Sequence, residues 1–145
     1  MSRLDEPIQR EKMDRDKLSV IKPKVDDVIA FFETNNSEYF RYFQKREYNI
    51  ISRHLYTALY LYDRTVFGYG HIDFENYNWL GVFIKEEFRG KNLSSYLLND
   101  LLKNCKEDVY LTVDLENIIA YNIYKKFGFK VVDKQDRYYL MVYKQ

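Results

Sequence analysis

The fold is decided by residues 79–105, which read WLGVFIKEEFRGKNLSSYLLNDLLKNC. Residues 79–84 are apolar on both faces, which is typical of a strand in the middle of a sheet. A polar turn containing Gly90 follows. Apolar residues then recur at helical spacing, at Leu93, Leu97, Leu98, Leu101, Leu102 and Cys105. This order of strand, basic turn and helix directs free backbone N–H groups and the positive end of a helix dipole at one place, which favours phosphate binding.

The composition is that of one globular domain. A chain of 145 residues can bury about 70% of the surface that its unfolded form exposes. Hydrophobic residues make up 46% and charged residues 31%, which excludes a disordered or membrane-embedded chain. The net charge of +1 provides no overall field that would attract nucleic acid or an anionic membrane.

The N-terminus and the cysteine content indicate a cytoplasmic protein. The chain is charged from Arg3 onward, without the apolar segment of a signal peptide, and no apolar run has the length of a membrane span. The single cysteine, Cys105, suits a reducing compartment. The two histidines, the cysteine and the scattered carboxylates never reach ligand spacing, so we expect no metal site.

The first half of the chain predicts a strand, two helices and three further strands. Residues 1–17 carry charges of alternating sign and are expected to form a solvated N-terminal extension to a single domain, 18–145. Residues 18–22 predict a strand, and residues 38–45 a short helix. The helix between them has one apolar face, made by Val25, Val28, Ile29 and Phe32. Three consecutive antiparallel strands are predicted at 54–62, 65–74 and 79–84.

The second half predicts a strand, a helix and a hairpin. Residues 109–115 form the strand, Asn117 caps the helix and Gly128 ends it. The predicted buried face of this helix consists of Ile119, Ala120, Ile123, Tyr124 and Phe127. Residues 129–132 and 138–143 form the hairpin. The sequence therefore predicts one α+β domain.

Two local motifs in these elements resemble the GCN5-related N-acetyltransferases, the GNAT superfamily. The family places Arg or Gln, two residues, Gly, one residue and then Gly or Ala between the fourth strand and the next helix. Residues 89–94, RGKNLS, match at Arg89, while Asn92 and Ser94 stand where small residues are expected. Residues 117–129, NIIAYNIYKKFGF, match the Asn, Ala, Tyr and Gly-Phe positions of the family's later helix. Asn92 keeps the turn possible because Asn adopts positive φ more readily than other non-glycine residues.

The resemblance implies a fold and a cofactor. The fold is a central, mostly antiparallel, twisted sheet that splays between its fourth and fifth strands and has helices on both faces. The co-substrate is acetyl-CoA, with its pyrophosphate on the backbone of residues 89–94 and its pantetheine arm along residues 82–84. The cofactor-binding residues implied are Val82, Phe83, Ile84, Arg89, Gly90, Lys91, Asn92, Leu93, Ser94, Asn117 and Tyr124.

The resemblance also implies catalytic roles. Tyr124 matches the family tyrosine that protonates the departing thiolate, and a phenol, with its pKa of about 10, carries a proton at neutral pH. General-acid assistance contributes about 10²–10⁴-fold. The proton acceptor stays open among His71, Asp73, Glu75 and water, with His71 first because histidine titrates nearest neutral pH.

The implied function is transfer of acetyl from acetyl-CoA to a primary amine by direct attack in a ternary complex. A small-molecule amine is favoured over a protein as acceptor, without nucleic-acid or membrane partners, and a homodimer is compatible. The segments 33–38, 39–45 and 133–137 are expected to recognise the acceptor. The alternative, motivated by Asn92 and Ser94, is a non-catalytic CoA-binding or partner-binding module that retains the fold.

Overall fold

The computed structural model describes residues 13–35, 40, 42–44 and 46–145 of the chain, in which the strands form one sheet of seven. In chain order the elements are η2 (Arg15–Lys17), β1 (Leu18–Ile21), α1 (Val25–Thr34), η3 (Tyr42–Gln44), η4 (Tyr48–Arg53), β2 (Tyr56–Tyr62), β3 (Thr65–Glu75), β4 (Tyr77–Ile84), η5 (Glu86–Phe88), α2 (Ser94–Lys103), β5 (Val109–Asp114), α3 (Ile118–Phe127), β6 (Lys130–Lys134) and β7 (Tyr138–Tyr143), where η denotes a 3₁₀ helix.

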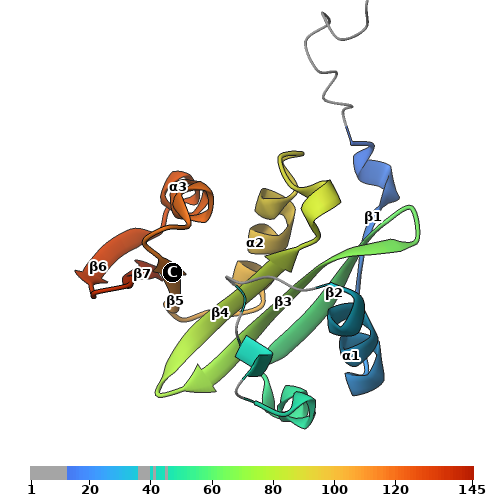
Figure 1. Ribbon diagram of the computed structural model, residues 1–145, viewed down its shortest axis with the longest axis horizontal. Helices are drawn as coiled ribbons and strands as arrows, with labels where there is room; N and C mark the ends of the chain where they lie inside the picture. Colours follow the sequence, from blue (N-terminus) through green and yellow to red (C-terminus); the bar gives the residue numbers. More distant parts are fainter. Residues whose placement is uncertain (1–12, 36–39, 41, 45) are drawn as a thin grey trace, which may run out of the picture.

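The sheet has the strand order β1-β2-β3-β4-β5-β7-β6. Neighbouring strands are antiparallel except β4 and β5, which run parallel. Along these two fully described strands the pairing joins only Asn78 to Val109 and Trp79 to Tyr110. Beyond these pairs the strands separate, and the part made of β5, β7 and β6 turns away from β1–β4 (Figure 1). The predicted splay between the fourth and fifth strands is confirmed.

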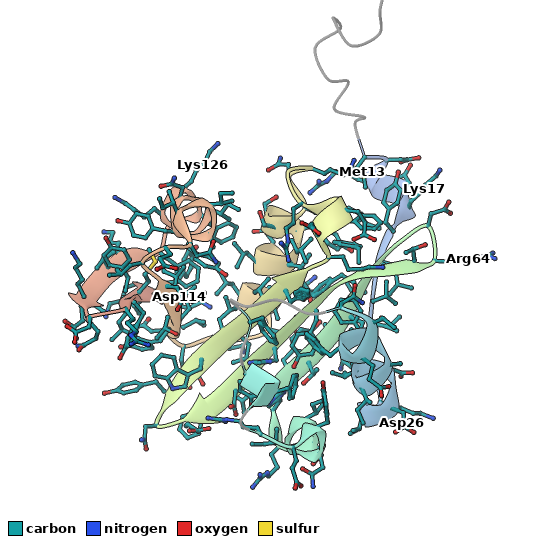
Figure 2. All side chains as sticks on the ribbon, in the orientation of Figure 1. Met13, Lys17, Asp26, Arg64, Asp114 and Lys126 are labelled. Atoms are coloured by element: carbon teal, nitrogen blue, oxygen red, sulfur yellow. The ribbon has the colours of Figure 1, made fainter. Side chains whose placement is uncertain are left out.

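Helices cover both faces of the sheet, as predicted. The larger cluster of buried apolar side chains includes residues of α2 and is flanked by partly buried residues of α3. The second cluster lies on the other face, where α1 and η4 contribute Val28, Phe31 and Ile51. Charged side chains such as Asp26 and Arg64 are exposed and point outward (Figure 2). The mixed sheet with helices on both faces confirms the predicted fold class.

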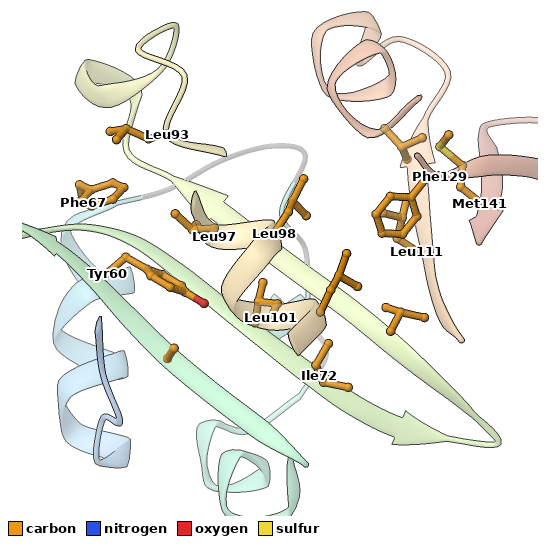
Figure 3. Packing of buried hydrophobic residues seen from close by; sticks show 14 residues of the cluster. Tyr60, Phe67, Ile72, Leu93, Leu97, Leu98, Leu101, Leu111, Phe129 and Met141 are labelled. Atoms are coloured by element: carbon orange, nitrogen blue, oxygen red, sulfur yellow. The ribbon is translucent and has the colours of Figure 1, made fainter. Parts of the chain in front are cut away.

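Helix α2 forms where the apolar spacing predicts it and anchors the loop before it. Its buried apolar residues are Leu97, Leu98, Leu101 and Leu102, and Leu93 just before the helix is also buried (Figure 3). The buried Asp100 accepts hydrogen bonds from the hydroxyls of Tyr56 and Tyr60, at 2.7 and 2.8 Å. Both apolar packing and a buried carboxylate therefore fix α2 to β2 and its neighbours.

The prediction for the buried face of α3 is partly wrong. The Asn117 side chain accepts a hydrogen bond from the Ala120 N–H at 3.3 Å, and Gly128 ends the helix with φ of 131°, as expected. Ile119, however, is 77% exposed, and none of the residues of this fully described helix is buried. The apolar face of α3 is open because Ile119, Ala120, Ile123 and Tyr124 line a cavity.

The structure also differs from the predictions in the N-terminal third. Of the predicted N-terminal extension, residues 14–17 are exposed, residues 15–17 form η2, and Met13 packs against the larger core cluster. Much of the predicted helix 38–45 lies outside the described residues, and its described part contains the 3₁₀ turn η3. A further 3₁₀ helix, η4, was not predicted. Among the described residues, no helix is both long enough and apolar enough to span a membrane.

Candidate active site

A cavity of about 1540 Å³ follows the splay of the sheet. Residues 80–84 of β4 line one side, and residues 111–114 of β5 with the apolar face of α3 line the other. One end, which we call the loop end, is formed by residues 88–94. The other, which we call the hairpin end, lies where β3 turns into β4 and is lined by Asp73, Glu75, Asn76, Tyr77 and Trp79. Because the pairing of β4 with β5 stops at Trp79, the outer edge of β4 faces this cavity along most of its length.

The loop end presents backbone N–H groups. Gly90 and Asn92 have φ angles of 75° and 62°, so the expected positive φ at Asn92 is confirmed. No side chain in the described part of the chain caps α2, which leaves its first N–H groups available to an anion. The Leu93 side chain is 1% exposed and faces the core, so only its backbone can serve this site.

The Arg89 side chain turns back onto β4. Its Nε donates a hydrogen bond to the Ile84 carbonyl at 2.8 Å, and its guanidinium lies 5.5 Å from the Phe83 ring centroid. Arg89 therefore fixes the path of the chain from β4 into the loop, in addition to lining the cavity.

Tyr124 lies on the α3 wall of the cavity, in the middle of the helix that Asn117 caps. Its ring meets Phe129 edge-on at 5.7 Å, and Phe129 is buried in the core. Tyr124 is partly buried, and the reduced solvation of its phenol raises the pKa to about 12, so the hydroxyl is protonated at neutral pH. Within the described residues no protein group accepts this hydroxyl's hydrogen bond, which leaves the proton available to a group in the cavity.

The hairpin end is built around Asp73 on β3. The Asp73 Oδ2 atom accepts a hydrogen bond from the Tyr42 hydroxyl at 2.7 Å and lies 3.0 Å from an Arg46 guanidinium nitrogen. Arg46 also forms an ion pair with Glu75 and lies over the Tyr42 ring at 4.8 Å. Two carboxylates against one guanidinium leave this end of the cavity with a net negative formal charge.

His71 lies beside this cluster and is 1% exposed. Its ring occupies the space that a side chain at position 81 would fill, since a Cβ on Gly81 would lie 2.4 Å from Nε2. The Tyr69 hydroxyl lies 2.7 Å from His71 Nδ1, and the rings of Tyr42 and His54 lie at 4.3 and 4.5 Å. The imidazole is therefore held from several sides.

The hydrogen bonds define where the protons of the His54 cluster lie. Tyr42 donates its one proton to Asp73, so the contact of 2.8 Å with His54 Nε2 requires His54 to donate. His54 Nδ1 then accepts from the Thr57 hydroxyl at 2.9 Å. Burial lowers the pKa of His54, and lowers the pKa of His71 well below its usual range, so both rings are neutral at pH 7.

The structure brings the sequence-predicted site residues into one cavity. All eleven predicted cofactor-binding residues line it, as do His71, Asp73 and Glu75. The hairpin 133–137, whose residues are all described, contributes nothing to its wall. Of the predicted acceptor segments, Phe40 and Tyr42 line the cavity, while residues 36–39, 41 and 45 lie outside the described residues.

Sequence reasoning missed the cluster of Tyr42, Arg46 and His54. Tyr42 lies 12 residues from His54 and 31 from Asp73 in the chain, and no local pattern marks these contacts. Among the described residues, no group of three His, Cys, Asp or Glu side chains is arranged to hold a metal ion.

Comparison with solved structures supports the fold. An N-acetyltransferase PaiA from Thermoplasma acidophilum, in complex with coenzyme A, is 20% identical with a TM-score of 0.71, covering 88% of this chain and 99% of that one. A spermidine N-acetyltransferase SpeG chimera from Vibrio cholerae and hSSAT is 16% identical with a TM-score of 0.70, covering 88% and 95%. Naa50 from Arabidopsis thaliana, in complex with the bisubstrate analogue CoA-Ac-MVNAL, is 20% identical with a TM-score of 0.67, covering 89% and 99%.

The sequence itself also identifies a family. No curated protein matches the chain. The model of the acetyltransferase (GNAT) family matches residues 25–129, which include the loop end, the hairpin end and the α3 wall of the cavity. Because this match spans well over half of the chain, the protein belongs to the GNAT family of N-acetyltransferases.

Proposed function

We propose that this GNAT protein transfers acetyl from acetyl-CoA to a primary amine, by direct attack of the amine in a ternary complex. The observation that carries the proposal is the single cavity that joins the uncapped N-terminus of α2, the free edge of β4 and the Tyr124 hydroxyl. Coenzyme A would supply the acetyl group as an activated thioester. The residues fit such a ligand because its phosphates and its pantetheine amides both need backbone partners.

Residues 89–94 and β4 would hold the cofactor. The left-handed backbone at Gly90 and Asn92 turns the loop so that its N–H groups and those of the α2 N-terminus face the same end of the cavity. Lys91 lines this end and adds positive charge. The free edge of β4 at residues 82–84 would pair with the pantetheine amides, as a strand pairs with an added strand.

Tyr124 would protonate the departing thiolate. Its pKa of about 12 keeps the phenol protonated through the neutral range, and its hydroxyl is open to the cavity. Asn117 and Gly128 support this role indirectly, because they set where α3 begins and ends.

The proton of the attacking amine would leave at the hairpin end. His71, Asp73, Glu75 and water remain the candidates. The His71 imidazole is neutral and keeps one ring nitrogen without a proton, but the burial that lowers its pKa also weakens it as a base, so Asp73, Glu75 and water stand beside it on equal terms. A base role at Nε2 requires that the Nδ1–H be donated to Tyr69.

The acceptor would be a small cationic amine. The net negative charge of Asp73, Glu75 and Arg46 favours a positively charged molecule over an acidic one. The similar SpeG chimera is a spermidine N-acetyltransferase, whereas the similar Naa50 is bound to the bisubstrate analogue CoA-Ac-MVNAL, so the preference for a small-molecule acceptor rests on the charge of the hairpin end. We also propose that the protein is located in the cytoplasm and forms a homodimer.

The experiment that tests the proposal is replacement of Tyr124 by phenylalanine. Thiol release from acetyl-CoA would be measured with a panel of diamines, monoamines and acidic amino acids, and we expect diamines to be the best acceptors. Tyr124→Phe should lower turnover by about 10²–10⁴-fold, while acetyl-CoA binding changes less than twofold.

Tyr121→Phe provides the matched control. Tyr121 lies on the same helix but does not line the cavity, and its ring packs on that of Tyr139, with 4.7 Å between the ring centroids. It should leave turnover unchanged. Unchanged turnover of Tyr124→Phe across the whole pH profile would reduce Tyr124 to a packing residue. Binding of acetyl-CoA without thiol release for any amine would favour the non-catalytic alternative.

A further inference from the structure

The segment 13–17 lies against the cofactor cavity although it precedes the residues that match the family, 25–129. Met13 packs against the larger core cluster. The Asp14 N–H donates to the Tyr62 hydroxyl at 3.2 Å, and the Lys17 carbonyl accepts from the Asp63 N–H at 2.9 Å. These contacts fix the backbone of the segment to the β2–β3 hairpin.

The same segment holds Arg15 at the loop end. Met13 and Arg15 both line the cavity together with residues 88–94, and Figure 2 shows Met13 on the side of the segment that faces the loop before α2. The Arg15 guanidinium lies 6.0 Å from the ring centroid of Tyr96, in the first turn of α2. A cation is therefore placed beside the uncapped helix N-terminus that the proposed function assigns to phosphate.

The charge inventory of the loop end leaves a role for this cation. Arg89 is turned back onto the Ile84 carbonyl. In η5, just before the loop end, Glu87 forms an ion pair with Lys85, and Glu86 adds a negative charge. Lys91 is the cation that the loop itself presents to the cavity. Lys126 of α3 also lines the cavity. Arg15 supplies a further cation from outside the residues that match the family, and its planar guanidinium suits paired phosphate oxygens.

We infer that Arg15 binds the phosphate groups of coenzyme A, so that the N-terminal segment completes the cofactor site. The inference rests on the proposed function, because it assigns a residue to the same acetyl-CoA site. Arg15 is exposed, so its contribution depends on ionic strength.

The test compares the affinities of three variants for acetyl-CoA and for S-acetylpantetheine, a thioester without phosphates. Arg15→Gln should bind acetyl-CoA about tenfold more weakly at low salt and S-acetylpantetheine as the wild type does. Arg15→Lys should recover part of the loss because it keeps the charge. Lys17→Gln is the matched control: it removes one positive charge from the same segment but from a side chain that does not line the cavity, and it should change neither affinity by more than twofold.

The outcomes distinguish failure of the proposed function from failure of the role of Arg15. Failure of the wild-type protein to bind acetyl-CoA would overturn the proposed function and this inference with it. Wild-type binding that Arg15→Gln leaves intact would overturn the role of Arg15 alone. Equal losses for both thioesters, or for Arg15→Gln and Lys17→Gln, would also overturn it, because phosphate recognition would then not be the cause.

Discussion

Replacing Gly81 by alanine should destabilise the fold through His71. The added Cβ would lie 2.4 Å from the Cε1 and Nε2 atoms of the His71 ring. Favourable contacts between such atoms begin near 3.5 Å, so the ring would have to move by about 1 Å. The Tyr69 hydrogen bond at 2.7 Å and the neighbouring rings of Tyr42 and His54 oppose that movement.

The magnitude follows from two contributions. Overpacking a well-filled site costs about 1–3 kcal/mol, and losing the hydrogen bond between Tyr69 and His71 costs about 1 kcal/mol more. The free energy of unfolding should therefore fall by about 2–4 kcal/mol. For a chain of this size the melting temperature should fall by about 6–12 °C.

A double-mutant cycle with His71→Ala isolates the cause. Urea unfolding followed by far-UV circular dichroism would give the free energy of unfolding for the wild type, both single variants and the double variant. Truncating His71 makes room for the new methyl group, so Gly81→Ala should be almost neutral in that background, and the coupling energy should equal the cost of the single variant, about 2–4 kcal/mol.

Gly90→Ala serves as the control. A Cβ at this position meets nothing within 4 Å, so the only cost of the substitution is the backbone strain of an alanine at a φ of 75°. It should show no coupling to His71→Ala. If the effects of Gly81→Ala and His71→Ala add to within about 0.5 kcal/mol, the argument from steric contact is refuted.

Two further predictions concern pH and the loop end. Burial lowers the pKa of His71 and His54 in the folded state, so below the ordinary histidine pKa the unfolded chain binds more protons than the folded one. The free energy of unfolding should therefore be highest above about pH 6.5 and decrease below it. His71 should contribute up to about 1.4 kcal/mol per pH unit to this decrease. Urea unfolding at pH 7.5 and 5.5 tests this prediction. The free energy of unfolding of His71→Gln should change less between the two pH values than that of the wild type, and an equal change in both proteins would contradict the prediction. Asn92→Gly should keep or tighten acetyl-CoA affinity in calorimetry, because glycine adopts the φ of 62° without strain and opens the loop. A large loss would show that the Asn92 side chain itself holds the cofactor.

Local patterns were sufficient to predict the two helices that lie next to the cavity. The apolar spacing after Leu93 predicts α2, and Asn117 with Gly128 predicts both ends of α3. These features depend on periodicity and capping, which a single sequence records. The order of strands and the splay came from the resemblance of the two motifs to a family.

Two kinds of feature could not be predicted from the sequence. Periodicity gives the apolar face of α3 but not what lies against it, so Ile119 was expected in the core although it lies at an open cavity. The contacts of Asp73 with Tyr42 and Arg46 join segments that are distant in the chain. Strand alternation implies that the side chains of His71 and Asp73, two residues apart, share one face of their strand, but it carries no information about the segment that covers them.

The short pairing between β4 and β5 has a consequence for hydrogen exchange. Only two residue pairs of these fully described strands join the β1–β4 part of the sheet to the β5–β7–β6 part. Amides on the outer edge of β4 beyond Trp79 lack a neighbouring strand, and they should exchange faster than the inner amides that pair with β3. A ligand that lies along β4 and reaches α3 would bridge the two parts. Its binding should therefore slow exchange on both sides of the splay at once.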